Sequence, residues 1–313
     1  MPEPSGPCRV CGAAVGAVIH AGGECYGRCG RCGVLQKAIT EAAYRALEPG
    51  YDPGAYLAGL SEAELRAFLR VDVAVQMLRD LCERHGRDPA GMSFLDVGCG
   101  MGRSLLAARD LGMSAVGFEP SAQHRTVATE LLRLDVVEDY FSPAKVGDRR
   151  FDLVLLSHVI EHIYRPGPFV DDLLSVLKPG GLLLMITPNA DSLSARLLGA
   201  EWPMLAPIDH VTMLTARSVR YLAPAGSVSE IRTSEYPWEF FATLGSVAKR
   251  RVKGHGANLP GRPAPTAPKL IREASWRSHA LRGLLTALSF PFYVAARGAN
   301  RAAALNVVLV KAA

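Results

Sequence analysis

Two acidic residues and a turn of three glycines have the clearest chemistry in this chain. Asp96 stands near the end of a short apolar run, Gly98, Gly100 and Gly102 follow it, and Glu119 ends the next apolar run. A glycine turn lets the backbone pass close to a ligand. The carboxylate of Glu119 could accept hydrogen bonds from both hydroxyls of a ribose, and Asp96 suits an ammonium group. The pattern therefore predicts a site for a positively charged nucleoside.

A dinucleotide site is the main alternative, because it also requires a glycine turn and a downstream acid. Its fingerprint is G-x-G-x-x-G, and Arg103 stands where the third glycine should be. Asp96 would also repel a pyrophosphate, whereas it suits a ligand that carries an ammonium and a sulfonium. This favours S-adenosylmethionine. Cys99, Pro120 and Ser157 complete the residues that we expect around this donor.

The segment resembles motif I of class I S-adenosylmethionine-dependent methyltransferases. Residues 151–163 resemble the fourth strand of these enzymes with its loop, and residues 177–189 resemble the turn into their fifth strand. The resemblance covers about residues 90–236 and is specific for the superfamily, not for any acceptor. It implies an α/β, Rossmann-like fold with a seven-stranded, mostly parallel sheet and helices on both faces.

The hydrophobic pattern predicts the elements that would position these residues. Expected strands are 93–97, 114–119, 135–139, 151–157, 181–187, 228–233 and 305–310. Expected helices are 61–84, which begins with a Ser61/Glu64 capping box, 102–111, 121–133, 167–177 and 216–222. Such alternation indicates a parallel sheet whose ligands bind at the carboxyl ends of the strands.

An insertion at about 237–303 separates the last two strands. Its first half, 249–268, is rich in glycine, proline and cations and should be mobile, and 276–299 reads as an apolar helix. This helix could cover the domain, form part of a lid, or contact a second copy or a membrane surface.

Four of the seven cysteines form two C-x-x-C-Gly pairs, Cys8/Cys11 and Cys29/Cys32. The spacing is typical of a zinc ribbon, because two-residue gaps let both thiolates of a pair reach one tetrahedral Zn²⁺. Disulfides are the alternative, which a reducing cytoplasm disfavours. Cys25 could replace one ligand, but we do not expect it to.

We expect a zinc-ribbon-like module at 1–40, a linker and a helix covering the donor site at 41–90, and the methyltransferase domain at 91–313. About forty residues cannot bury enough core to fold alone, so the metal would stabilise the module. The module could be a structural cap, a wall of the acceptor pocket, or an RNA-recognition element.

The candidate catalytic residues follow strands four and five of the predicted sheet. His158, Glu161 and His162 form an H-x-x-E-H pattern, and His210 follows Asp209 further along the chain. His158 or His210 could act as a base or position the acceptor. The pattern is also similar to the Glu-x-x-Glu-His of methyltransferases that modify the terminal ribose of small RNAs with a divalent metal. A second divalent metal at these four residues is therefore an alternative, although histidine replaces the first glutamate.

The net charge of +5 is local. Seven cations and no acid lie between residues 249 and 272, so the rest of the chain has a net charge of 5 − 7 = −2. We expect no signal peptide and no transmembrane segment, and a cytoplasmic location.

The exit from the fifth predicted strand, Thr187-Pro188-Asn189, and the cysteine pairs resemble bacterial methyltransferases that modify sugars and secondary metabolites. The predicted function is transfer of a methyl group to a small-molecule acceptor by in-line displacement. We expect the acceptor atom to be an oxygen. Two alternatives remain: an RNA methyltransferase that uses the ribbon and the basic segment, and a non-catalytic partner protein. A homodimer is compatible with either.

Overall fold

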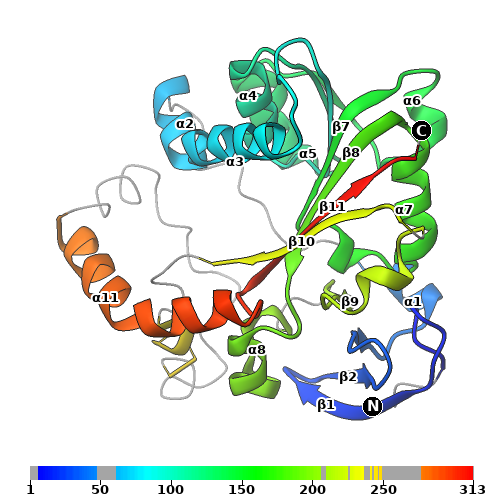
Figure 1. Cartoon of the computed structure of the whole chain (residues 1–313), viewed down its shortest axis with the longest axis vertical. Helices are drawn as coiled ribbons and strands as arrows, with labels where there is room; N and C mark the ends of the chain where they lie inside the picture. The colour runs from blue at the N-terminus through cyan, green and yellow to red at the C-terminus, as the bar shows by residue number, and fades with distance from the viewer. Residues whose placement is uncertain are drawn as a thin grey trace. The chain divides into compact units, whose positions relative to one another are not determined.

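The computed structural model describes residues 6–47, 61–205, 209–224, 226–235, 240–241, 243–245, 247–248 and 276–312, except the side chains of 276–282. The chain forms two compact units (Figure 1). One consists of Met1–Pro49, Ile160–Gly167 and Ile186–Val307, and the other of Gly50–Val159, Pro168–Met185 and Val308–Ala313. The predicted mobile half of the insertion, 249–268, and the basic segment, 249–272, lie outside the described residues.

A seven-stranded sheet has the order β10-β11-β8-β7-β4-β5-β6. Its strands are β4 (Ser93–Val97), β5 (Ser114–Phe118), β6 (Val136–Val137), β7 (Phe151–Ser157), β8 (Leu177–Pro188), β10 (Val228–Ser234) and β11 (Ala304–Val310). β4 pairs in parallel with β5 and β7, and β5 pairs in parallel with β6. The predicted α/β, Rossmann-like architecture is confirmed.

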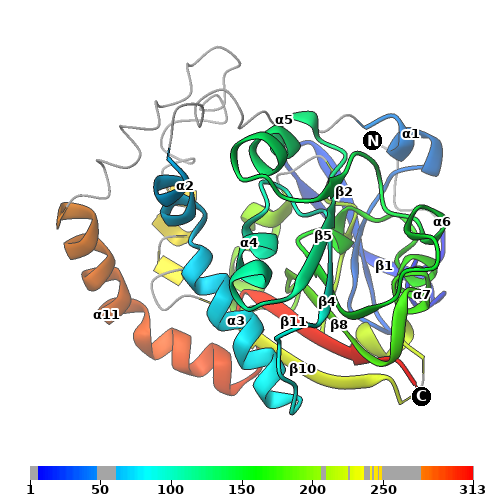
Figure 2. The same ribbon diagram turned by 90° about the horizontal axis from the view of Figure 1, so that it is seen from above.

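Helices cover both faces of the strands in the second unit. They are α2 (Glu62–Leu69), α3 (Val71–Arg84), α4 (Arg103–Asp110), α5 (Ala122–Thr126), α6 (Pro143–Val146) and α7 (Pro166–Ser175). α3 and α4 lie on one face, and α6 and α7 lie on the other (Figures 1 and 2). The strand cores are almost wholly apolar, as sheets buried on both faces require.

Two predicted helices of the second unit differ in the structure. The single helix expected at 61–84 is divided at Arg70, whose left-handed backbone (φ 54°) ends α2 and starts α3. A residue in this conformation interrupts the hydrogen-bond ladder, and it lets both Leu69 and Val71 be buried. The Ser61/Glu64 capping box is present. The helix expected at 121–133 begins as α5 and continues as a π-helical turn, Val127–Leu131.

The first unit contains a second, four-stranded sheet with the order β1-β2-β3-β9. β1 (Val15–Ala21), β2 (Glu24–Cys29) and β3 (Leu35–Lys37) come from the predicted N-terminal module, whereas β9 (Thr212–Met213) comes from much later in the chain. β3 and β9 pair antiparallel, with Leu35 opposite Met213. The module therefore shares its sheet with a strand from beyond β8.

Apart from β10 and parts of β8 and β11, which belong to the seven-stranded sheet, the other described elements of this unit are helical. They are α1 (Glu41–Arg45), α8 (Leu193–Leu198) and α11 (Trp276–Gly298), with single 3₁₀ turns at Ile160–His162, Gly199–Glu201, Pro203–Leu205 and Val219–Tyr221. The helix predicted at 216–222 is thus reduced to the last of these turns. Tyr26, Leu35 and Met213 pack with Trp202 and Leu205 in a core that joins the small sheet to the loops after β8.

Candidate functional site

The glycine turn after β4 requires glycine at two positions. Gly98 and Gly102 have φ of 73° and 86°. A Cβ on Gly98 would lie 2.5 Å from Val159 Cγ2, and one on Gly102 would overlap Leu134. Gly100 also has a positive φ (54°), but nothing lies within 4 Å of its absent Cβ. Val159 and Leu134 therefore pack against the two ends of the turn, whereas the space beside Gly100 is open, as a ligand-binding turn requires.

Glu119, at the end of β5, holds this turn through its buried carboxylate. One oxygen accepts a hydrogen bond from the Gly100 amide and the other accepts one from the Ser121 amide, both at 2.8 Å. These are the two oxygens that would have to accept from a ribose. The binding group is thus held in position by backbone donors before any ligand arrives.

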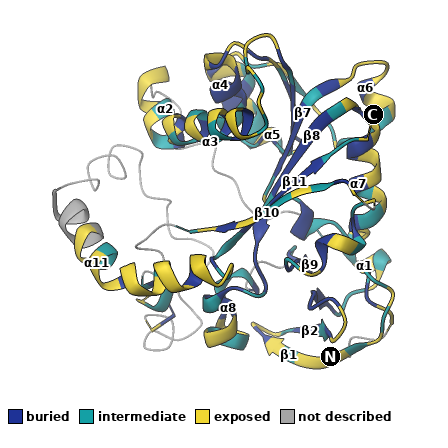
Figure 3. Ribbon diagram, in the orientation of Figure 1, coloured by how far each residue is buried: buried dark blue, intermediate teal, exposed yellow. Residues whose placement is uncertain are grey.

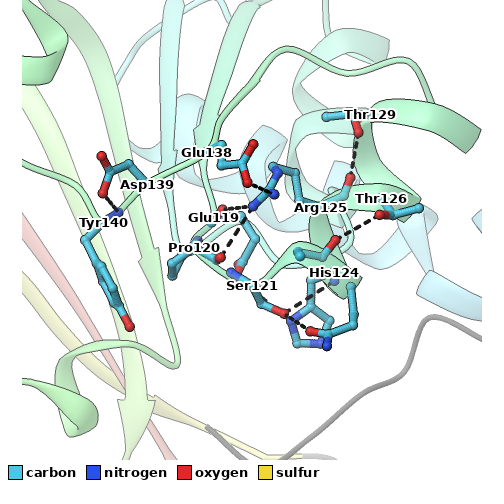
Figure 4. Close-up of polar contacts among 12 residues, drawn as sticks. Glu119, Pro120, Ser121, His124, Arg125, Thr126, Thr129, Glu138, Asp139 and Tyr140 are labelled. Atoms are coloured by element: carbon cyan, nitrogen blue, oxygen red, sulfur yellow. Dashed lines mark hydrogen bonds and ion pairs between the residues drawn. The ribbon is translucent and has the colours of Figure 1, made fainter. Parts of the chain in front are cut away.

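The loop that follows Glu119 is also fixed (Figure 4). Arg125 donates to the carbonyl oxygens of Glu119 and Pro120 at 3.2 and 3.4 Å, and it forms an ion pair with Glu138. The Ser121 side chain caps α5 by accepting from the His124 amide. Four of the residues that the sequence predicts to bind the methyl donor therefore lie at one fixed turn: Gly98, Gly100, Gly102 and Glu119.

Asp96 lies in β4, two residues before Gly98, and is 3% exposed. Burial raises the pKa of Asp96 to about 7, and the charge of Glu119 adds to this rise. Keeping a buried carboxylate ionised costs free energy, and a cationic ligand beside it would offset this cost and stabilise the ionised form.

The other predicted donor residues differ in burial. Cys99 is buried against Gly117, where a Cβ would meet its sulfur at 2.5 Å, so its side chain fills space within the second unit. Burial raises the pKa of the Cys99 thiol. Pro120 is exposed and Ser157 is half-buried.

Three of the four candidate catalytic residues form one cluster in the first unit. Ligand-type atoms of Glu161, His162 and His210 lie within 4.8 Å of one another, and the two imidazole rings meet edge to face at 4.7 Å. Glu161 is fully buried, and one carboxylate oxygen accepts from the Thr187 hydroxyl at 3.0 Å. The main chain closes the cluster, because the Val211 amide donates to the Glu161 carbonyl oxygen at 2.8 Å.

Each histidine of the cluster has one ring nitrogen fixed by an acceptor. His210 Nδ1 lies 2.7 Å from the Met204 carbonyl oxygen, which can only accept, so Nδ1 carries the proton and Nε2 keeps a lone pair. His162 Nδ1 lies 3.1 Å from the Asp209 carboxylate. Both rings are thereby oriented, and each has a second nitrogen for chemistry.

The pKa values of the two histidines shift in opposite directions. Burial lowers the pKa of His210, which favours its neutral imidazole. Burial alone would also lower the pKa of His162, but the hydrogen bond and charge of Asp209 raise it. The same hydrogen bond lowers the pKa of Asp209. A buried histidine whose Nε2 keeps its lone pair, beside the His162–Asp209 pair, has the geometry of a general base.

His158, the fourth candidate, is not a member of this cluster. It is exposed and has a left-handed backbone, with φ 56°. A non-glycine residue in this conformation stores strain, which is common at functional loops.

The four predicted zinc ligands meet at one point. Cys8 and Cys32 have their sulfurs 3.5 Å apart, as do Cys11 and Cys29, and all four lie within 4.8 Å of one another. Tetrahedral zinc with Zn–S bonds of about 2.3 Å separates sulfurs by roughly 3.8 Å. None of the four is in a disulfide, and Cys25 is outside the group.

The two cysteine pairs have the same backbone geometry. In the first, the Gly12 amide donates to the Cys8 carbonyl oxygen, and in the second the Gly33 amide donates to the Cys29 carbonyl oxygen, both at 2.9 Å. Burial would raise the pKa of the Cys29 thiol, but hydrogen bonds from the Cys32 amide and the neighbouring sulfurs lower it. A lowered pKa favours the thiolate form of Cys29, whereas burial raises the pKa of the Cys8 and Cys32 thiols.

The cysteine module contacts the segment that carries His210. The Tyr26 hydroxyl is 3.4 Å from the His210 carbonyl oxygen, to which it donates, and Arg9 donates to the Val211 carbonyl oxygen at 3.0 Å. The Thr215 hydroxyl donates to the Cys32 carbonyl oxygen at 2.7 Å. Sequence reasoning missed Arg9 and Tyr26, and it missed the contact of Thr187 with Glu161, because no local pattern marks contacts with residues that are distant along the chain.

Comparison with known proteins identifies the family of the chain. The family model described as "Methyltransferase domain" matches residues 68–224, which is half of the chain. The chain is 32% identical over 181 residues to the ubiquinone biosynthesis O-methyltransferase of Chelativorans sp. (strain BNC1), covering 53% of this chain and 70% of that protein.

Other relatives are matched over less of their length. The enzyme of the same name from Rhodopseudomonas palustris (strain BisA53) is 33% identical over 144 residues, 42% of this chain and 56% of that protein. The chain thus spans little more than half of this relative. A solved coclaurine N-methyltransferase, bound to N-methylheliamine and SAH, aligns with 76% of this chain and 72% of its own, at 19% identity and a TM-score of 0.47. The family model and the Chelativorans relative show that the chain belongs to the class I S-adenosylmethionine-dependent methyltransferases.

Proposed function

We propose that this protein transfers a methyl group from S-adenosylmethionine to a hydroxyl of a small molecule. The observation that carries the proposal is Asp96, a buried acid at the glycine turn whose charge a cationic donor would stabilise. The oxygen acceptor is supported by the name of the relatives, which are O-methyltransferases of ubiquinone biosynthesis. A sugar or another secondary metabolite stays a prediction of the sequence.

In this mechanism each donor residue has a separate task. Glu119, held by the amides of Gly100 and Ser121, would accept hydrogen bonds from the ribose hydroxyls. Asp96 would pair with the ammonium group. Gly98, Gly100 and Gly102 would leave room for the ligand. The donor carries its own activated methyl group, so the protein has to orient the reactants and remove one proton.

We assign removal of that proton to His210. Its Nδ1 is tied to Met204, its pKa is lowered, and its Nε2 keeps the lone pair that a base needs. The His162–Asp209 pair would orient the neighbouring ring. The hydroxyl would give its proton to Nε2 while its oxygen attacks the methyl carbon and the sulfur leaves with the bonding electron pair. His158 is the alternative base from the sequence.

The same cluster fits a divalent cation. Two imidazoles and one buried carboxylate are a common set of metal ligands. Hydrogen bonds would orient them: Thr187 with Glu161, Asp209 with His162, and the Met204 carbonyl oxygen with His210. Such a cation would polarise the acceptor hydroxyl. We keep it as the second hypothesis for the cluster, beside the base.

We further propose that Cys8, Cys11, Cys29 and Cys32 hold a structural Zn²⁺, which supports the β1–β3 module. Because Tyr26 and Arg9 bond to the backbone at 210 and 211, this module would hold the catalytic histidine in place. The module would then stabilise the position of the His210 segment, and this structural role explains the module without RNA recognition.

Two variants test the assignment. His210→Ala should bind S-adenosylmethionine with unchanged affinity but lose about 100-fold or more in methyl transfer, as expected for removal of a base. His158→Ala is the matched comparison and should keep most of the activity. If only His158→Ala loses transfer, the base is His158 and our assignment is wrong.

Metal analysis distinguishes the base from the cation. The cation hypothesis predicts a second bound metal that Glu161→Gln and His210→Ala both lose while the zinc of the cysteine module remains. A single metal, lost only in Cys29→Ser, would leave the base as the mechanism.

A further inference from the structure

Helix α11 exposes large apolar side chains along one face. A helix on the surface of a globular protein normally buries apolar side chains and exposes polar ones. In α11 the buried positions include Ser289 and Ala296, whereas Leu284, Leu288, Phe290 and Val294 are each more than half exposed. Figure 3 shows this exposed surface along most of the helix.

The exposure is concentrated on this one helix. Of the nine large hydrophobic side chains exposed in the described residues, five are on α11: Leu284, Leu288, Phe290, Phe292 and Val294. Clusters of this kind mark interaction sites, whereas single exposed apolar residues do not. No polar side chain interrupts the outer face between Gly283 and Ala295, since Thr286, Ser289 and Tyr293 are all buried or half-buried.

The inner side of α11 is already occupied. Phe292 stacks on Phe240 at 4.7 Å and meets Phe241 edge to face at 5.5 Å. The Phe241 amide donates to the Ser289 hydroxyl at 3.4 Å. These contacts fix the rotation of the helix about its axis, so the apolar outer face is a consequence of packing.

Charge identifies the partner. The helix contains Arg277 and Arg282 before its apolar stretch and Arg297 after it, and the chain has no acidic residue from 276 to 313. Arg297 also lies over the Tyr293 ring, 5.4 Å from its centre. An apolar stretch between cations matches an anionic lipid surface, where the apolar side chains enter the boundary and the cations meet the headgroups.

A second copy of the chain fits less well. Pairing two α11 helices antiparallel would bring Arg297 of each copy to the arginine-bearing first half of the other, and parallel pairing would bring Arg297 against Arg297. Either arrangement places like charges together, with no acid on either helix. No helix among the described residues has the length and hydropathy to span a bilayer.

We propose that the outer face of α11 binds the surface of an anionic membrane, with the helix lying in the interface. This goes beyond the proposed methyl transfer and does not depend on it. A methyltransferase bound in this way could act on acceptors dissolved in lipid.

The test is sedimentation of the full chain with vesicles of phosphatidylcholine, with and without phosphatidylglycerol as about a third of the lipid. Binding should require phosphatidylglycerol and weaken as salt is raised. Leu288→Glu and Phe290→Glu should each reduce binding about tenfold or more, because each removes apolar area and adds a negative charge.

Leu197→Glu is the matched control, because Leu197 is 61% exposed on α8 of the same unit. It should bind vesicles as the unchanged protein does, and unchanged S-adenosylmethionine binding would show that all three variants are folded. Equal loss of vesicle binding in all three variants would overturn the proposal. So would a protein that binds no vesicles, whether it is monomeric or forms a dimer that Leu288→Glu dissociates.

Discussion

Replacement of Asp96 by asparagine should stabilise the ligand-free protein and abolish donor binding. The side chains have the same shape, so the change removes mainly a charge. The pKa of Asp96 is about 7 in the folded protein and 3.8 is its ordinary value, a difference of about 3 units. At about 1.4 kcal/mol per unit, keeping Asp96 ionised costs the folded state about 4 kcal/mol above pH 7.

The sign follows from proton binding. Between pH 4 and pH 7 the folded state holds a proton on Asp96 that the unfolded state has lost, so stability falls as pH rises through this range. Asp96→Asn has no such dependence at this position. The advantage of the variant should grow from about 2 kcal/mol at pH 5 to about 4 kcal/mol at pH 8. For a chain of this size, 4 kcal/mol corresponds to a melting temperature roughly 5 to 10 °C higher.

The assay is a thermal melt at several pH values, with and without S-adenosylmethionine. The unchanged protein should be stabilised by the donor, with an affinity that falls about tenfold per pH unit below pH 7 as Asp96 becomes protonated. Asp96→Asn should melt higher alone and gain nothing from the donor. Asp171→Asn, an exposed control on α7, should do neither. A variant that melts at or below the unchanged protein at pH 8 would refute the burial cost of Asp96.

Three further predictions concern the turn, the metal and the acceptor side. Gly102→Ala should destabilise the protein by about 3 kcal/mol in urea unfolding, because the new Cβ overlaps Leu134 at a positive φ. Gly100→Ala should cost only about 1 kcal/mol, because Gly100 also has a positive φ but has open space where the Cβ would lie. Equal costs of the two variants would contradict the packing. Cys29→Ser should lose zinc, measured by mass spectrometry of the intact protein, and lower the melting temperature, while Cys25→Ser keeps the metal; zinc retained in the first variant would contradict the four-cysteine site. Asp209→Asn should lower the free energy of unfolding by about 0.5 kcal/mol between pH 4 and 7, the range in which Asp209 is ionised and His162 is protonated. The difference between the variant and the unchanged protein should shrink as pH rises above the raised pKa of His162 or falls below pH 4. A difference that grows above pH 7 would show that the pair is not ionic.

The donor half of the protein was predictable from sequence because its signals are local. Asp96, the glycines and Glu119 lie at the ends of adjacent parallel strands, so strand and turn periodicity brings them together. Boundaries were less accurate: β6 is only Val136–Val137, and the helix at 61–84 is divided because Arg70 adopts a left-handed backbone. No periodicity signals a single residue of this kind.

The acceptor side was only partly predictable. The sequence identified Glu161, His162 and His210 as candidates but grouped His158 with them, because spacing on one helical turn suggests that all three of H-x-x-E-H share a face. The left-handed backbone of His158 and the 3₁₀ turn at Ile160–His162 replace that helix. The pairing of β3 with β9 is between residues about 180 positions apart, and only tertiary packing determines it.

The most direct test of the central claim is methyl transfer from labelled S-adenosylmethionine into an extract of cells that make this protein. The products are separated into a small-molecule fraction and an RNA fraction, with Asp96→Asn as the control without donor binding. We predict label in the small-molecule fraction, absent with the variant, on a compound whose methyl group is attached to oxygen. Label that enters the RNA fraction and is released by ribonuclease would contradict the account and make the cysteine module an RNA-recognition element.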